Sequence, residues 1–172
     1  IVICLFSLAC TSKHSFGPEM PQITTAVDPV WFDQMQAMEN EEQWDELQKM
    51  AGFVLAHTQL SDRQRAWGVY YAGRVFLEKG EGRLALAYAR ESANEMPSEL
   101  RPQILLGLTE QRFGNTMRAE NILYNLLAKY PANQDVHLAL GRANETSAHW
   151  SAARAWYSKA LTLKPADFDL QS

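Results

Sequence analysis

Apolar residues recur every three or four positions over most of the chain, which is the spacing of amphipathic helices. Near the end of the chain, Val136, Leu140 and Ala143 would share one face of such a helix. Asn133 stands where this helix needs a cap, and the segment 147–149 interrupts the pattern. We therefore predict a short helix that starts after Asn133 and ends at this break.

A second predicted helix follows each first one. The last begins at Trp150 and carries an apolar face as far as Leu161. The same pattern of two helices occurs twice upstream, with glycine-containing turns at 80–82 and 114–115. Ser98 is the predicted cap of the middle unit. The pattern as a whole predicts an all-α protein built from helix pairs.

Three types of residue repeat with a period of 34 residues, the clearest regularity in the sequence. The prolines end the units, the glycines lie in first helices and the alanines in second helices: Pro97, Pro131 and Pro165; Gly73, Gly107 and Gly141; Ala85, Ala119 and Ala153. They define units 66–99, 100–133 and 134–167. Small residues let crossing helices approach closely, so we expect glycine on one helix and alanine on the other to bring the two backbones together.

These positions resemble the consensus of the tetratricopeptide repeat (TPR), which has glycine in its first helix, alanine in its second and proline at its end. The match is closest in the unit that contains Gly141, Ala153 and Pro165. The resemblance implies a right-handed solenoid of about four antiparallel helix pairs over residues 28–167.

A fourth, degenerate unit is predicted at 28–61. Met35 and Leu47 stand there in place of the small residues, and four extra residues, 62–65, precede the next unit. Irregularity is expected of a terminal, capping repeat. At the other end, residues 168–172 would start a further helix or form a tail.

The first residues look like an export signal. Residues 1–9 are an uncharged apolar run, too short to span a bilayer but as long as the core of a signal peptide. Leu8-Ala9-Cys10 resembles the lipobox of bacterial lipoproteins, in which the cysteine carries the lipid. We expect a signal peptide truncated at its start, a lipidated Cys10 and a flexible tether over 10–27. The alternatives are an ordinary secretory signal and a buried apolar segment.

The expected location follows from the same resemblance. A lipid on Cys10 would anchor the chain stably in a membrane. Thr11, rather than aspartate, after the cysteine favours the bacterial outer membrane, with the chain on its periplasmic face.

The composition of the chain excludes several classes of protein and of site. The chain has 172 residues, 47% of them hydrophobic, and 16 Lys and Arg against 20 Asp and Glu, a net charge of −4. It is too apolar for a disordered chain and too acidic for a nucleic-acid binder with a broad basic surface. Because Cys4 and Cys10 are its only cysteines, the body of the chain has no cysteine for a zinc site or a disulfide.

No arrangement typical of catalysis is present. The sequence lacks a Gly-x-Ser-x-Gly elbow, a phosphate-binding glycine loop and a His-Glu-x-x-His pair, and its four histidines are scattered. We expect no enzyme activity, no cofactor and no metal site. One acidic run is predicted to be a solvated surface rather than a cation site: Glu39, Glu41, Glu42, Asp45 and Glu46.

The resemblance also implies a concave groove lined by the first helices. Its predicted residues are Trp67, Tyr70, Arg74, Arg101, Ile104, Leu108, Arg112, Leu138 and Arg142, with Gln111, Asp135 and Glu145 beside them. Arg74 and Arg142 hold equivalent positions, and both would pair with acidic groups of a bound peptide. Alternatively, these arginines only keep an exposed face soluble, beside Glu78 or Glu145, or the partner binds the convex face. The other tryptophans are predicted to pack inside, Trp31 in the core and Trp44, Trp150 and Trp156 between helices.

The expected function is a non-catalytic scaffold that holds proteins or peptides together in the bacterial envelope. Its partners would be other proteins and, through the lipid, the membrane, with no role for nucleic acid. Lipoproteins that assist assembly of type IV pili have a similar build, and they are the nearest analogy. The alternatives are a soluble TPR adaptor without a lipid, a TPR part of a larger envelope protein, and self-association through the last helix pair.

Overall fold

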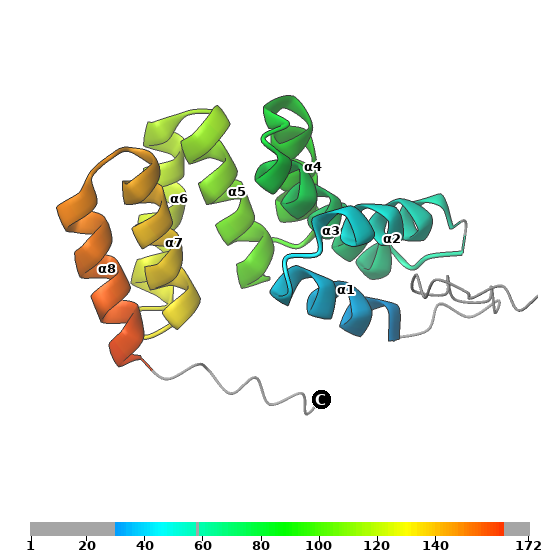
Figure 1. Ribbon diagram of the computed structural model, residues 1–172, viewed down its shortest axis with the longest axis horizontal. Coiled ribbons are helices and arrows are strands. Elements are labelled where there is room, and N and C mark those ends of the chain that lie inside the picture. Colours follow the sequence, from blue (N-terminus) through cyan, green and yellow to red (C-terminus); the bar gives the residue numbers. More distant parts are fainter. Residues whose placement is uncertain (1–29, 58, 164–172) are drawn as a thin grey trace, which may run out of the picture.

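The computed structural model describes residues 30–57 and 59–163, which form eight α-helices and no strand (Figure 1). The helices are α1 (Val30–Asn40), α2 (Trp44–Ala56), α3 (Asp62–Lys79), α4 (Gly82–Glu95), α5 (Leu100–Phe113), α6 (Thr116–Lys129), α7 (Gln134–Thr146) and α8 (Trp150–Thr162). The all-α prediction is therefore confirmed for this part of the chain. The predicted signal, Cys10 and tether, together with Pro165 and 168–172, lie outside the described residues.

Helices that are consecutive in the sequence pack against each other. In Figure 1 they follow one another along the long axis, from α1 and α2 at one end to α7 and α8 at the other. Turns of two or three residues join α1 to α2, α3 to α4, α5 to α6 and α7 to α8, which is typical of antiparallel pairs. The odd-numbered helices also contact each other, α3 with α5 and α5 with α7.

The bounds of the helices repeat with the sequence period. The helices α4, α6 and α8 begin at Gly82, Thr116 and Trp150, which are 34 residues apart. The starts of α5 and α7, Leu100 and Gln134, have the same spacing. The four extra residues 62–65 form the first turn of α3, which is why that helix has 18 residues where its equivalents have 13 or 14.

Three of the four turns within pairs have the same backbone geometry. In the α3–α4 turn, Gly80 has a φ of 77°, and Glu81 donates its N–H to the carbonyl five residues earlier. Glu42 and Ala148 hold the same place in the α1–α2 and α7–α8 turns, with φ of 56° and 58° and the same hydrogen bond from the next residue. This is the Schellman ending of a helix, which favours glycine at the left-handed residue. Among these three turns, only α3–α4 has glycine at the left-handed residue.

Side-chain caps fix several helix starts. The predicted cap Asn133 is confirmed, since its side chain accepts the N–H of Val136 at 3.2 Å. Asn115 caps α6 in the same way, and Ser61 forms a capping box at the start of α3. The prediction for Ser98 is wrong, because the cap position of α5 is the next residue, in register with Asn133 one period later.

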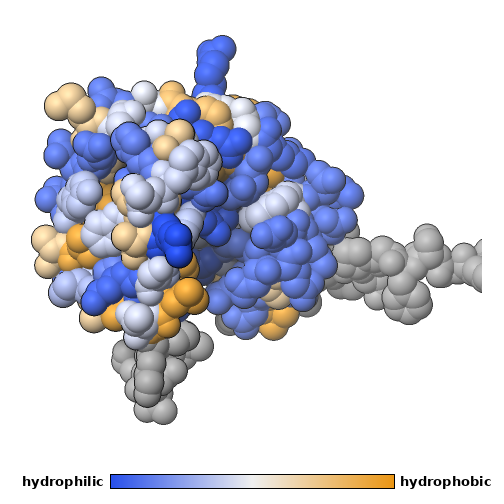
Figure 2. Space-filling view, turned by 60° about the vertical axis from the view of Figure 1, so that its left-hand side comes forward, coloured by the Kyte–Doolittle hydropathy of each residue, from blue (hydrophilic) through white to orange (hydrophobic). Residues whose placement is uncertain are grey.

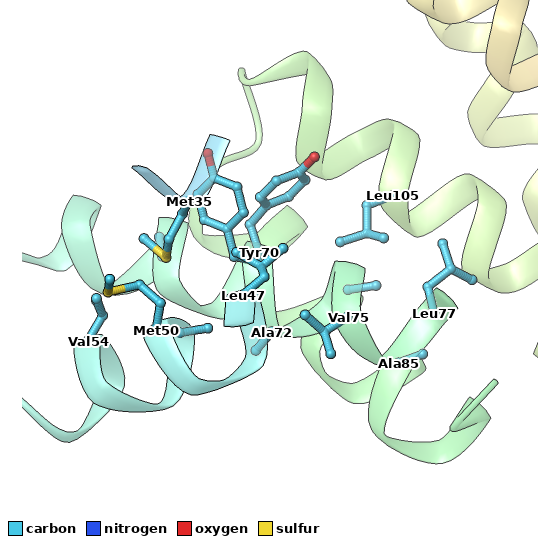
Figure 3. Packing of buried hydrophobic residues seen from close by; sticks show 14 of the residues in the cluster. Met35, Leu47, Met50, Val54, Tyr70, Ala72, Val75, Leu77, Ala85 and Leu105 are labelled. Atoms are coloured by element: carbon cyan, nitrogen blue, oxygen red, sulfur yellow. The ribbon is translucent and has the colours of Figure 1, made fainter. Parts of the chain in front are cut away.

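The buried side chains form two clusters. The larger one contains residues from all five helices α1 to α5 and includes Met35, Leu47, Met50, Val75 and Leu105 (Figure 3). The smaller one lies among α5, α6, α7 and α8. The bulky residues of the degenerate unit, Met35 and Leu47, are completely buried between α1 and its neighbours. The irregular first pair is therefore an integral part of the core.

The repeated small residues lie where helices meet. Ala85, Ala119 and Ala153 are buried. A Cβ atom on Gly107 would lie 2.7 Å from Leu123, and one on Gly141 would lie 2.4 Å from the ring of Tyr157. The residue that fills the space over the glycine is thus four positions after the alanine, not the alanine itself. Gly73 is less tightly enclosed, with Leu105 of α5 nearest at 3.1 Å, whereas Pro97 and Pro131 lie exposed just after α4 and α6.

The tryptophans divide into buried and exposed. Trp31 lies in the core, as predicted, and Trp44 and Trp156 are half-buried against the two clusters. The prediction for Trp150 is wrong, since 65% of this residue is exposed. It is the first residue of α8, and no helix among the described residues follows to cover that face.

Candidate partner-binding surface

The nine predicted groove residues come from three helices that lie side by side. Each odd-numbered helix supplies several: Trp67, Tyr70 and Arg74 from α3; Arg101, Ile104, Leu108 and Arg112 from α5; Leu138 and Arg142 from α7. Because α5 contacts both α3 and α7, this row is continuous. The side chains differ greatly in how accessible they are.

The apolar members are half-buried with one exception. Ile104, Leu108 and Leu138 keep part of their surface in solvent, as does Trp67. Tyr70 is buried, and its prediction as a groove-lining contact is therefore corrected. Its ring lies edge-on to those of Trp67 and Tyr71, with centroids 5.3 and 5.1 Å away.

Two of the predicted arginines bind the same carboxylate of the chain, that of Glu39. Arg74 donates from Nε to Oε1 of Glu39 at 2.7 Å, and Arg101 donates from Nη2 to the other oxygen of the same carboxylate. The hydroxyl of Tyr70 also donates to Oε1, at 3.1 Å. We call Glu39, Tyr70, Arg74 and Arg101 the Glu39 cluster. It ties the end of α1 to α3 and α5.

The Glu39 cluster is largely shielded from water. The side chains of Glu39, Arg74 and Arg101 are 10%, 11% and 30% exposed. Arg74 pairs in addition with Glu78 at 3.0 Å, one helical turn along α3. Its guanidinium lies 5.4 Å from the ring centroid of Trp44. Two arginines and two glutamates thus balance in charge.

Aromatic rings surround the second guanidinium. The Cζ atom of Arg101 lies 5.1 to 5.9 Å from the ring centroids of Trp67, Tyr70 and Tyr71, which is the range of cation–π attraction. Burial alone would lower the pKa of Arg101, but the neighbouring Tyr70 and Glu39 outweigh it and raise that pKa. Burial raises the pKa of Tyr70 far above its usual value, so its hydroxyl stays protonated and donates to Glu39.

These contacts correct two predictions. Glu39 was expected on a solvated acidic surface, yet it is the common acceptor of a buried cluster. Arg74 and Arg142 were expected to be equivalent ligand-binding arginines, but Arg74 is engaged within the chain whereas Arg142 is exposed. The neighbour foreseen for Arg74, Glu78, is confirmed. The acidic members Glu41, Glu42 and Asp45 are exposed, as predicted.

The far end of the row has its own contacts. Arg112 donates to the carbonyl of Leu77 at 3.0 Å and so closes the end of α3. Gln111 donates to Ser147 at 2.6 Å, and Glu145 accepts from the hydroxyl of Tyr157 at 2.6 Å.

Sequence reasoning missed a second buried carboxylate, Glu110 of α5, which has no exposed surface. Its Oε1 accepts from Arg90 of α4 at 2.8 and 3.0 Å and from Arg118 of α6 at 3.3 Å. Its Oε2 accepts the backbone N–H of Asn115 at 3.1 Å. Burial alone would raise the pKa of Glu110, but these hydrogen bonds prevail and lower it. We call these four residues the Glu110 cluster; all of them belong to the scaffold that holds α4, α5 and α6 together.

The even-numbered helices carry the most exposed large apolar side chains. Met117 and Tyr124 lie on α6, and Trp150 and Leu161 lie on α8. Figure 2, which brings this end of the molecule forward, shows apolar residues as separate patches among polar ones rather than as one broad area.

No described helix is long and apolar enough to cross a bilayer. Within residues 30–57 and 59–163, no group of three or more His, Cys, Asp or Glu side chains is placed to hold a metal ion. No model of a known protein family matches the chain, and no curated protein matches it either. Functional assignment therefore depends on the residues themselves.

Proposed function

We propose that residues 28–167 form a right-handed, TPR-like solenoid, and that the chain is a non-catalytic scaffold that binds a protein partner in the bacterial envelope. The observation that carries this proposal is the 34-residue repeat of the helix bounds. Contacts of α5 with both α3 and α7 support it, because in a solenoid of helix pairs the first helices line one surface.

The partner would bind chiefly where α5 and α7 meet. The half-buried side chains of Ile104, Leu108 and Leu138 offer apolar contact there, and Arg142 offers an exposed guanidinium. Apolar anchors beside an arginine are typical of the residues that dominate protein–protein affinity. The neighbouring stretch of α3 and the start of α5 are less available, because the Glu39 cluster engages Arg74 and Arg101.

The experiment for the binding surface is a crosslinked pull-down from solubilised envelopes. The test variant carries Leu138→Asp and Arg142→Glu on α7. The matched control carries Tyr124→Asp and Arg154→Glu, which make the same kinds of change at exposed positions of α6 and α8. We expect a protein that is recovered with the wild type and the control but lost with the test variant. Equal recovery with all three would contradict the proposed surface, and loss with the control alone would place the partner on the even-numbered helices. Both variants must retain helical circular dichroism.

The envelope location rests on Leu8-Ala9-Cys10, and it has its own test. The chain is expressed with a methionine and a short lysine- and arginine-containing stretch placed before Ile1, so that Leu8-Ala9-Cys10 remains the lipobox, and Cys10→Ala is compared with Cys4→Ala, since these are the only two cysteines. We expect Cys10→Ala to leave the membrane fraction and to lose incorporation of labelled fatty acid, while Cys4→Ala keeps both. An unchanged distribution of Cys10→Ala would contradict lipid anchoring and favour a soluble adaptor.

A further inference from the structure

The Glu39 cluster contains an ion-pair site whose acceptor belongs to another helix. Its three donors are Tyr70 and Arg74 on α3 and Arg101 on α5. The carboxylate that fills it comes from Glu39, the next-to-last residue of α1. Donors that converge from two helices on both oxygens of one carboxylate form a preorganised carboxylate site.

We propose that Tyr70, Arg74 and Arg101 are a binding site for an acidic side chain of the protein partner, and that Glu39 occupies this site as a competing internal ligand. The proposal rests on the proposed function and names both the chemistry of the partner and a means of regulating its binding. In the form described here the site is closed by the chain itself.

The site can be reached from solvent. Arg101 is 30% exposed, and it lies on the same row of odd-numbered helices as the half-buried Trp67 and Ile104. An incoming glutamate or aspartate would therefore meet a guanidinium bordered by apolar surface. The rings around Arg101 limit competition from water, which strengthens a charge-assisted hydrogen bond there.

Release of Glu39 does not require α1 to leave the core. Trp31 and Met35, which are buried, hold the helix by its earlier turns. Glu39 lies in the last turn, where the helix dipole disfavours a negative charge. Glu42, three residues later, has a left-handed backbone that asparagine or glycine adopts more readily. Met38, which packs against the larger cluster, and the hydrogen bond from Gln43 to the carbonyl of Met38 also hold the end of α1, so release of Glu39 means that its side chain turns away while the helix stays in place.

The partner is accordingly an acidic segment whose carboxylate is flanked by apolar side chains. Such a segment could bind Arg74 and Arg101 only when the side chain of Glu39 turns away. Competition from Glu39 therefore lowers the apparent affinity of the segment for this site. A purely structural ion pair would accept no outside carboxylate, and this difference makes the proposal testable.

The test is chemical rescue in the full chain. Glu39→Ala empties the site, and the probe is N-acetyl-glutamate amide, with N-acetyl-glutamine amide as the neutral control at the same ionic strength. We expect the glutamate probe at saturation to raise the Tm of Glu39→Ala by roughly 3 °C or more above the glutamine probe. The wild type, whose site is filled, should show no difference between the probes, and neither should Glu39→Ala combined with Arg101→Gln. Equal effects of both probes on Glu39→Ala would overturn the proposal.

A second variant covers the case in which Glu39→Ala does not fold. Glu39→Gln keeps the shape of the side chain but removes its charge. The arginine side-chain N–H signals of Arg74 and Arg101, observed by NMR, should shift on addition of the glutamate probe in this variant and not in the wild type. Signals that stay unchanged would count against the site.

The pull-down separates this inference from the proposed function. A partner lost with Leu138→Asp and Arg142→Glu should be recovered at least about threefold more with Glu39→Gln than with the wild type. A partner that depends on the α7 residues but is indifferent to Glu39→Gln would refute the internal ligand and leave the proposed function standing. If the partner does not depend on the α7 residues, the proposed surface fails, and the rescue experiment still decides whether the carboxylate site exists.

Discussion

The carboxylate of Glu110 accepts the backbone N–H of Asn115 at 3.1 Å, and it replaces the main-chain carbonyl that accepts the equivalent N–H in the other three helix pairs. Phe76 and Asn144, one period away on either side, use their backbone carbonyls for this hydrogen bond. In the α5–α6 pair, a side chain thus accepts the hydrogen bond that closes the end of the first helix. A Cβ atom on Gly114 would lie 2.1 Å from the same carboxylate, so this turn has room for glycine alone.

Replacing this carboxylate should destabilise the fold. Glu110→Gln keeps the shape but removes the charge that holds Arg90, Arg118 and the N–H of Asn115. Because both arginines are about half exposed and can return to water, we expect a loss of about 1–3 kcal/mol in the free energy of unfolding, measured with urea. The control is Glu120→Gln, an exposed position on α6, which should change it by less than about 0.5 kcal/mol. Equal effects of the two substitutions would contradict the role of Glu110.

The contribution of Glu110 should depend on pH in one direction. Its pKa is lowered in the folded chain, so the unfolded state binds the proton more tightly. The stabilisation is therefore fully present above the pKa of a free glutamate, about 4.3, and is lost as the pH falls through the lower pKa of the folded state. The difference in unfolding free energy between wild type and Glu110→Gln should be constant from about pH 7 to 5.5 and shrink below about pH 4.3. A difference that grows on acidification would refute this assignment.

The three left-handed turn residues offer a matched pair of substitutions. Ala148 has a φ of 58°, which costs a residue with a Cβ atom about 1–2 kcal/mol, whereas Gly80 at the equivalent position has no such cost. Ala148→Gly should raise the free energy of unfolding by about 0.5–1 kcal/mol, after the added entropy of the unfolded chain is counted. Gly80→Ala should lower it by about 1 kcal/mol. The same sign for both, in thermal or urea unfolding, would show that the turns are not equivalent.

The close contact at Gly141 should tolerate no methyl group. A Cβ atom there would lie 2.4 Å from the ring of Tyr157, so we expect Gly141→Ala to cost about 1–3 kcal/mol of unfolding free energy. Gly52 on α2 is the control, since a Cβ atom on it would meet nothing within 4 Å. Gly52→Ala should stabilise by about 0.5–1 kcal/mol through helix propensity. Adding Tyr157→Ala to Gly141→Ala should cost less than the two changes made separately; simple additivity would argue against the contact.

The helix pairs could be predicted from the sequence because packing limits the size of the glycine and alanine residues that repeat in them. Gly107 and Gly141 each have a side chain packed directly on them, so these units need a small residue at the same place. The cap Asn133 and the turn at 114–115 were readable for the same reason, since each depends on neighbours within a few residues. Features that depend on residues close in the sequence can therefore be recognised from the sequence alone.

The two buried carboxylates could not be predicted in the same way. Glu39 pairs with residues 35 and 62 positions away, and it stands next to an exposed acidic run that suggested solvent. Glu110 replaces a phenylalanine and an asparagine at equivalent positions, a departure that would have been the only hint. Its arginines lie 20 residues before it and eight residues after it. Which cation meets which anion is decided by how the helices pack.

The division of the core into two clusters has a consequence for how the chain opens. The larger cluster and the Glu39 cluster hold the helices from α1 to α5 together, and Arg101 contacts Glu39, which is 62 positions away. Amide hydrogens in α3 and α5 should therefore exchange with solvent only when this whole region unfolds as one cooperative unit. The helix α8, in which Ala153 and Ala160 are the only buried residues, should exchange through local opening at a much lower free energy. Protection should thus fall from the middle of the chain towards α8, and proteases should cut first near that end.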